Sequence, residues 1–198
     1  MGRIGTFSGL VVVISFIAAG AAINAAGYEF RNTYWGMTIS QVKQSESGSP
    51  IYEESLSSVY DYILAYEGYV QGIPATIGYL FKDNQLIEAG FRLKTIRGNK
   101  NLYINDFNDI KKSIIPIHGK STKSYMKWSD STYKNDPANY GTAVAEGHLK
   151  LHEVWVNPKT EIVLTMKSGK NSNDLVFGAT YRSAVLKPEP DSYTLSGR

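Results

Sequence analysis

Three short motifs carry hydroxyl and amine groups in the pattern of the boxes that build the active site of penicillin-recognising serine enzymes. They are SYMK at residues 124–127, SDS at 129–131 and KSG at 167–169. In those enzymes the first box opens a buried helix and the second lies on a distant element. Here the first two boxes fall within one short segment, so they cannot converge on a nucleophile. We interpret the segment as a solvated strand or loop.

Two histidines, His148 and His152, stand four residues apart, a spacing that suits a shared metal ion on a helix. The local sequence alternates instead, with Leu149 and Leu151 on one side and the histidines on the other. On a strand, residues four apart are separated by about 13 Å, which is too far for one ion. The histidines are therefore predicted on the exposed face of a strand, and no metal ion or cofactor is predicted.

Two further patterns, a partial phosphate-binding loop and a pair of adjacent carboxylates, are each incomplete as catalytic or binding motifs. Residues 119–121 (GKS) match the end of a phosphate-binding loop, but Ile114 occupies the position of its first glycine. Adjacent carboxylates occur at Glu53 and Glu54, yet nothing distinguishes a general acid from a general base. Catalysis is therefore not predicted, and a hydrolase stays as an alternative.

The most informative pattern is a run of tyrosines in a strand-like segment. Tyr60, Tyr62 and Tyr66 alternate onto one face, together with Leu64. If that face is exposed, it forms an aromatic platform suited to protein or glycan contacts. If it is buried, the rings belong to the core and their hydroxyls reach the rim. With Trp35, an expected anchor, these tyrosines are the candidate binding residues.

Composition narrows the class of protein. The chain has 198 residues, 20% of them charged, and a net charge of +3. Its lysines and arginines are scattered along the sequence, so nucleic acid is not predicted as a partner. There is no cysteine, which excludes disulfides, thiolate metal sites and a lipid-anchored N-terminal cysteine.

The N-terminus has the features of an export signal. Arg3 precedes the short apolar stretch 9–18, and small residues follow at 19–21 and 25–27. A cleaved signal peptide over residues 1–26 is predicted, with an uncleaved membrane anchor as the alternative. In both cases the rest of the chain is expected to be exported, in a periplasmic or secreted location.

The elements that must position these residues follow two similar plans. Thr38 and Gln41 form a capping box for a helix that begins at Ile39. A second helix is predicted to begin at Phe107, capped by Asp106. Strand-like stretches follow each helix, with hairpin turns predicted at 82–85 and 157–160.

This order predicts an α+β fold of two related units, each a short helix packed on an antiparallel β-sheet. The predicted divisions are a signal peptide (1–26), a first unit (27–98), a second unit (99–186) and a disordered tail (187–198). Because one helix covers only part of a sheet, the units are expected to share a core or a continuous sheet.

The stretch from Gly36 to Pro50 resembles the G-M-T-x-x-Q-V…L-G-x-P signature of the SmpA/OmlA (BamE-like) envelope proteins. The tandem layout is similar to that of the β-lactamase inhibitor proteins, and residues 28–46 resemble uncharacterised exported bacterial proteins with a W-G-M-[ST]-x-x-x-V-K motif. The resemblance implies a helix-plus-sheet fold and a role in non-catalytic protein contact. The chain lacks the lipid-anchor cysteine of the first family and the disulfides of the inhibitors.

These features favour an exported, non-catalytic binding protein of the bacterial cell envelope that contacts a protein or a small ligand through a sheet face. A membrane contact is expected only through an uncleaved N-terminal segment. The alternatives are a periplasmic or secreted hydrolase and a carrier of small apolar ligands. A cleft where carboxylates or histidines with shifted pKa converge would favour the hydrolase, and a cavity lined by Tyr, Ile and Val the carrier. A flat aromatic patch would favour the binding protein.

Overall fold

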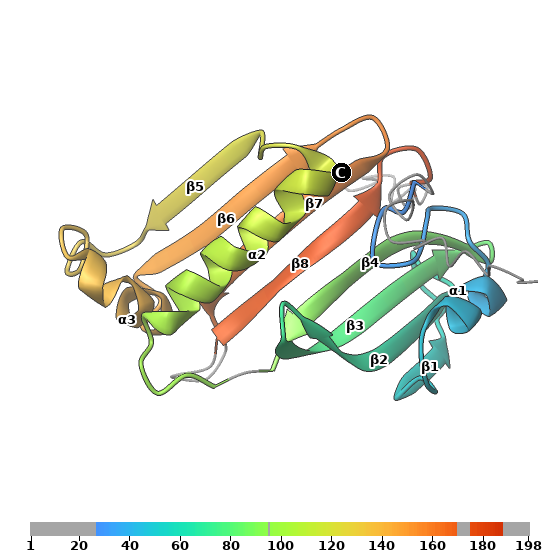
Figure 1. Cartoon of the computed structure of the whole chain (residues 1–198), viewed down its shortest axis with the longest axis horizontal. Coiled ribbons are helices and arrows are strands. Elements are labelled where there is room, and N and C mark those ends of the chain that lie inside the picture. Colours follow the sequence, from blue (N-terminus) through green and yellow to red (C-terminus); the bar gives the residue numbers. More distant parts are fainter. Residues whose placement is uncertain (1–26, 95, 170–174, 188–198) are drawn as a thin grey trace, which may run out of the picture.

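The computed structural model describes residues 27–94, 96–169 and 175–187 (Figure 1). The helices are α1 (Ile39–Ser45), α2 (Leu102–His118) and α3 (Tyr140–Ala145), the last preceded by the short 3₁₀ turn η2 (Pro137–Asn139). The strands are β1 (Tyr52–Ser55), β2 (Tyr62–Val70), β3 (Ile73–Lys82), β4 (Gln85–Leu93), β5 (Lys123–Trp128), β6 (Leu149–Val156), β7 (Thr160–Ser168) and β8 (Leu175–Ser183).

All eight strands belong to one antiparallel sheet with the order β1-β2-β3-β4-β8-β7-β6-β5. Strands β1 to β4 form one meander and strands β5 to β8 form another, and the two meanders meet where β4 pairs with β8. We call this pairing the seam. The prediction of two units, each a short helix packed on its own sheet, is wrong, because all eight strands form a single sheet. The continuous sheet that the two halves were expected to share is present, since β4 pairs with β8.

The two predicted hairpin turns are present. Lys82 pairs with Gln85 at the β3–β4 turn, and Asp83 and Asn84 between them have φ of 51° and 57°. Two consecutive left-handed residues are the geometry that a tight hairpin needs, and Asp and Asn tolerate it well. The β6–β7 turn at 157–160 is closed by a hydrogen bond from the Asn157 N–H to the Thr160 carbonyl at 3.0 Å.

One face of the sheet is the core, and we call it the helix face. Side chains alternate along each strand, so β3 and β7 show buried residues at every second position. α2 closes this face over β6 to β8 (Figure 1) with a stripe of residues at helical spacing. The stripe consists of Tyr103, Phe107, Ile110 and Ile114. The buried part of α3 belongs to the same core.

The first helix forms as predicted. Thr38 accepts a hydrogen bond from the Gln41 N–H, and the Gln41 side chain accepts one from the Thr38 N–H, which completes the capping box. The predicted start of the second helix is wrong. α2 begins at Leu102, and Asp106 lies inside it, where its carboxylate binds the Arg97 guanidinium at 2.9 Å instead of capping the backbone.

The opposite face of the sheet, which we call the open face, is covered by none of the described helices. Strand register defines it, because residues paired across the strands share a face. None of the helices in the described part of the chain has the length and apolar character that a bilayer span requires. The predicted signal peptide and the tail residues 188–198 lie outside the described residues.

Candidate functional site

The candidate tyrosines do not lie together on an exposed face. Tyr66 is 1% exposed and belongs to the core, and Tyr62 is partly buried beside it on the helix face. Tyr60 precedes β2 and donates its hydroxyl to Glu88 on the open face at 2.6 Å. Burial, and then this hydrogen bond, raise the pKa of Tyr60 to about 12. The three residues therefore form no single platform.

Trp35 anchors the segment that crosses the seam on the helix face. It is partly buried, and its Nε1–H donates to the Thr160 hydroxyl at 2.9 Å. Thr160 in turn donates to the Glu29 carboxylate. In the same segment, Phe30 packs against Tyr79 of β3 and Tyr181 of β8, with ring centroids 5.7 and 4.8 Å away. These contacts attach the N-terminal segment to both meanders.

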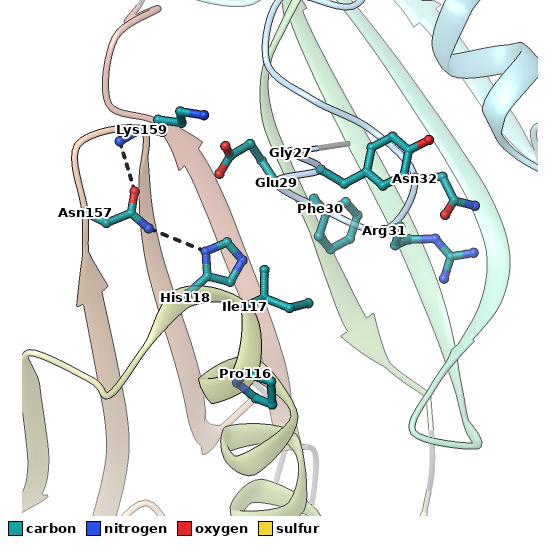
Figure 2. A pocket seen from close by; sticks show the side chains of 11 residues that line it. Gly27, Glu29, Phe30, Arg31, Asn32, Pro116, Ile117, His118, Asn157 and Lys159 are labelled. Carbon is teal, nitrogen blue, oxygen red and sulfur yellow. Dashed lines mark hydrogen bonds between the residues drawn. The ribbon is translucent and has the colours of Figure 1, made fainter. Parts of the chain in front are cut away.

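A cavity of about 400 Å³ opens beside this segment (Figure 2). We call it the seam cavity. Figure 2 shows the lining residues Glu29, Phe30 and Arg31 on the N-terminal segment, His118 at the end of α2, and Asn157 at the β6–β7 turn. A histidine and a carboxylate in one cleft are the arrangement that would favour the hydrolase.

The hydrogen bonds of His118 are those of a structural residue. Burial lowers its pKa, and the influence of Glu29 opposes that shift. Its Nδ1 lies 3.5 Å from Asn157 Nδ2, which can only donate, so Nδ1 accepts. This contact occupies the acceptor nitrogen of a neutral imidazole.

Two charged groups of the seam cavity also have partners within the protein. Arg31 binds the Glu46 carboxylate at 2.9 Å, and the Glu29 carboxylate receives the Thr160 hydroxyl. Thr160 itself is fully buried, so its hydroxyl cannot reach a substrate. The contacts around the cavity thus connect the two meanders and the N-terminal segment. The geometry of the cavity supplies no activated nucleophile.

The open face over β5 to β8 has a different character. Side chains on this face of β5, β6 and β7 include Lys127, Lys150 and Lys167, which we call the lysine ladder. Lys127 is directly opposite Lys150, and Lys167 follows Met166, the partner of Leu151, so it continues the same row. Like charges directly opposite one another on adjacent strands destabilise a sheet.

The pKa of His152 is influenced by the charges of the ladder. His152 is two residues after Lys150 on β6 and lies on the same face, and its Nδ1 contacts the Thr165 hydroxyl at 3.0 Å. Burial lowers the pKa of His152, and the positive charges of Lys167, Lys150 and Lys127 lower it further. The imidazole is therefore held neutral in a positive environment.

More cations surround the ladder on the same face. Lys123 faces outward on β5, and Arg92 lies on β4 opposite Gly178. Among the described residues, Lys123, Arg92 and the three ladder lysines have no ion pair with an acidic side chain. On the same face Arg182, by contrast, binds Glu88 at 2.7 Å.

A hollow of about 320 Å³ lies between the ladder and the seam. Lys167 and Arg92 stand at its border, and the hydroxyls of Thr165 and Thr180 line it. Gly178 forms part of its floor, where an added Cβ would lie 2.1 Å from the Phe91 carbonyl oxygen. The hollow therefore offers cationic and hydroxyl groups around a floor that includes Gly178 and the side chains of Val163 and Val176.

Alternation of polar residues in two strands is the sequence signal for this surface, although the lysines are scattered along the chain. Lys123, Tyr125 and Lys127 alternate, as do Lys150 and His152, so each strand shows one polar face. Only the pairing of the strands brings those faces into one row. Composition gives no indication of it, because the net charge is only +3.

No protein-family model, curated protein or solved structure matches the chain. The resemblance to small envelope proteins and to inhibitor proteins therefore stays a prediction.

Proposed function

We propose that this protein is an exported, non-catalytic binding protein of the cell envelope, and that it holds an anionic partner on the open face of its sheet over β5 to β8. The observation that carries the proposal is the lysine ladder. Three lysines in one row repel one another, and the described residues provide no acidic side chain to compensate them. An anionic partner would supply the missing charge.

The seam cavity supports the non-catalytic part of the proposal. Its histidine, arginine and glutamate have partners within the protein. The exported location rests on the N-terminal sequence alone. The sheet-face part is supported by the absence of any helix on the open face among the described elements.

Lysine acylation of the full chain tests the proposal. The rate of modification at each lysine is measured by mass spectrometry, with and without a cell-envelope extract. We expect slower modification at Lys127, Lys150 and Lys167. Lys112, Lys120 and Lys134 are exposed elsewhere on the protein and serve as controls. Equal slowing of both sets, or no slowing of the ladder lysines, would count against the proposal.

A further inference from the structure

The proposed anionic partner can be assigned a chemical class, and this inference rests on the proposed function. The cations form an elongated track and not a single point. It begins at Lys127 on the edge strand β5, passes Lys150 and Lys167, and reaches Arg92 on β4 beyond the hollow. Four strand-to-strand spacings of about 4.8 Å give a track about 19 Å long.

We infer that this track binds an extended, base-free polyanion whose charges are phosphate groups. The side chains present suit phosphate. A lysine ammonium is a compact point charge with three donors that binds phosphate oxygens, and the arginine fork at the end of the track can bind a phosphate through two N–H groups. The ladder consists of lysines, and the hydroxyls of Thr165 and Thr180 line the hollow, where they can donate to phosphate oxygens.

Nucleic acid fits this face less well. Proteins that bind single strands place aromatic rings under successive bases, and each stacked base adds about 1–3 kcal/mol. On the open face of β5 to β8, Tyr125 is the one phenylalanine, tyrosine or tryptophan, and it lies on the edge strand. The phosphate chain can be held along the track, but stacking would be lost.

A flat lipid surface also fits less well. Lys167 and Arg92 border a hollow in the sheet, so a planar bilayer would reach the ladder near the edge and miss the far end of the track. A flexible chain can enter the hollow and follow all of the cations. The occupant is therefore a linear polymer and not a membrane.

Equilibrium binding of the full chain to labelled long-chain inorganic polyphosphate tests the inference. The comparison ligands are polyglutamate, heparin, an oligo-dT strand of matched charge, and vesicles of phosphatidylglycerol. We expect polyphosphate to bind most tightly, and its affinity to fall as salt rises. The triple variant K127E/K150E/K167E should lose at least about 100-fold in affinity, since each cation near an anionic array contributes roughly a factor of five.

The matched control is K112E/K120E/K134E, which changes the net charge by the same amount on other surfaces of the protein. It should lose less than about 3-fold, because those side chains lie off the track. If the reversed ladder prevents folding, the neutral triple K127Q/K150Q/K167Q replaces it, with folding checked by circular dichroism.

The outcomes separate the two proposals. Equal or tighter binding of polyglutamate, heparin, oligo-dT or vesicles, still dependent on the ladder, would overturn the assignment of a phosphate polymer and leave the anion-binding function standing. Failure of every anion to bind, or an equal loss in the control triple, would overturn both.

Discussion

On the open face of the sheet, the lysines on one side of the seam have carboxylate partners, whereas the lysine ladder on the other side has none in the described part of the chain. Over β1 to β4 the two lysines of this face have carboxylate partners: Lys82 binds Asp61 at 2.9 Å, and Lys94 binds Glu67. Over β5 to β8, the lysine ladder has no such partners among the described residues. Both regions are four-stranded meanders with their helices on the other face. The difference therefore lies in side-chain chemistry and not in backbone architecture.

We infer from this difference that uncompensated like charges mark the binding surface proposed above, which no sequence motif indicates. A protein can compensate a surface lysine with a nearby carboxylate, as the first meander does. The second meander instead aligns like charges across neighbouring strands, at a cost of some tenths of a kcal/mol for each opposed pair. Such a cost is expected where an external anion completes the site.

The largest expected effect is a loss of stability caused by a substitution at the seam, where the two meanders pair. Gly178 on β8 faces Arg92 of β4 at the seam, and a Cβ there would lie 2.1 Å from the Phe91 carbonyl oxygen. Gly178→Ala should therefore lower the free energy of unfolding by about 2 kcal/mol, the cost of overpacking a close contact. Urea denaturation followed by circular dichroism measures it.

Gly78→Ala is the matched control on β3. Gly78 lies on the same sheet, and an added Cβ would have no atom within 4 Å. We expect a change within about 0.5 kcal/mol. If the two substitutions destabilise the protein equally, the close approach of the strands at the seam is not what requires a glycine.

Replacing one lysine by glutamine should change the free energy of unfolding by a smaller amount, and with opposite sign in the two regions. Lys127→Gln removes one of two lysines placed directly opposite each other, so it should raise the free energy of unfolding by about 0.5 kcal/mol. Lys82→Gln removes the partner of Asp61 and should lower it by up to about 1 kcal/mol. Both are measured by urea denaturation at low salt, and both should shrink at high salt. Destabilisation by Lys127→Gln would contradict the uncompensated ladder.

Local signals in the sequence predicted the parts of the fold that depend on neighbouring residues. The Thr38–Gln41 capping box needs only a three-residue spacing, and the β3–β4 turn needs only Asp83 and Asn84. The strands with regular alternation, such as β3 and β7, were predicted from the same kind of pattern.

Long-range pairing accounts for what the sequence could not predict. β1 is exposed at every position and β5 at nearly every one, so neither shows the alternation that identifies a half-buried strand. α3, which has only six residues, was not predicted. The ladder requires the register of three strands, and a single sequence does not give that register.

The pKa of His152, measured by NMR titration of the full chain, tests the central claim most directly. Burial and the charges of Lys167, Lys150 and Lys127 lower this pKa, so the free protein should titrate below the usual value near 6.5. In that window the unfolded chain binds more protons, so stability should fall as pH drops below about 6.5. Polyphosphate should raise the pKa of His152 towards its usual value by neutralising the ladder. His118, whose pKa is lowered by burial on the helix face, serves as the internal control and should not move. A His152 pKa that polyphosphate leaves unchanged, or that moves together with that of His118, would contradict a binding surface at the ladder.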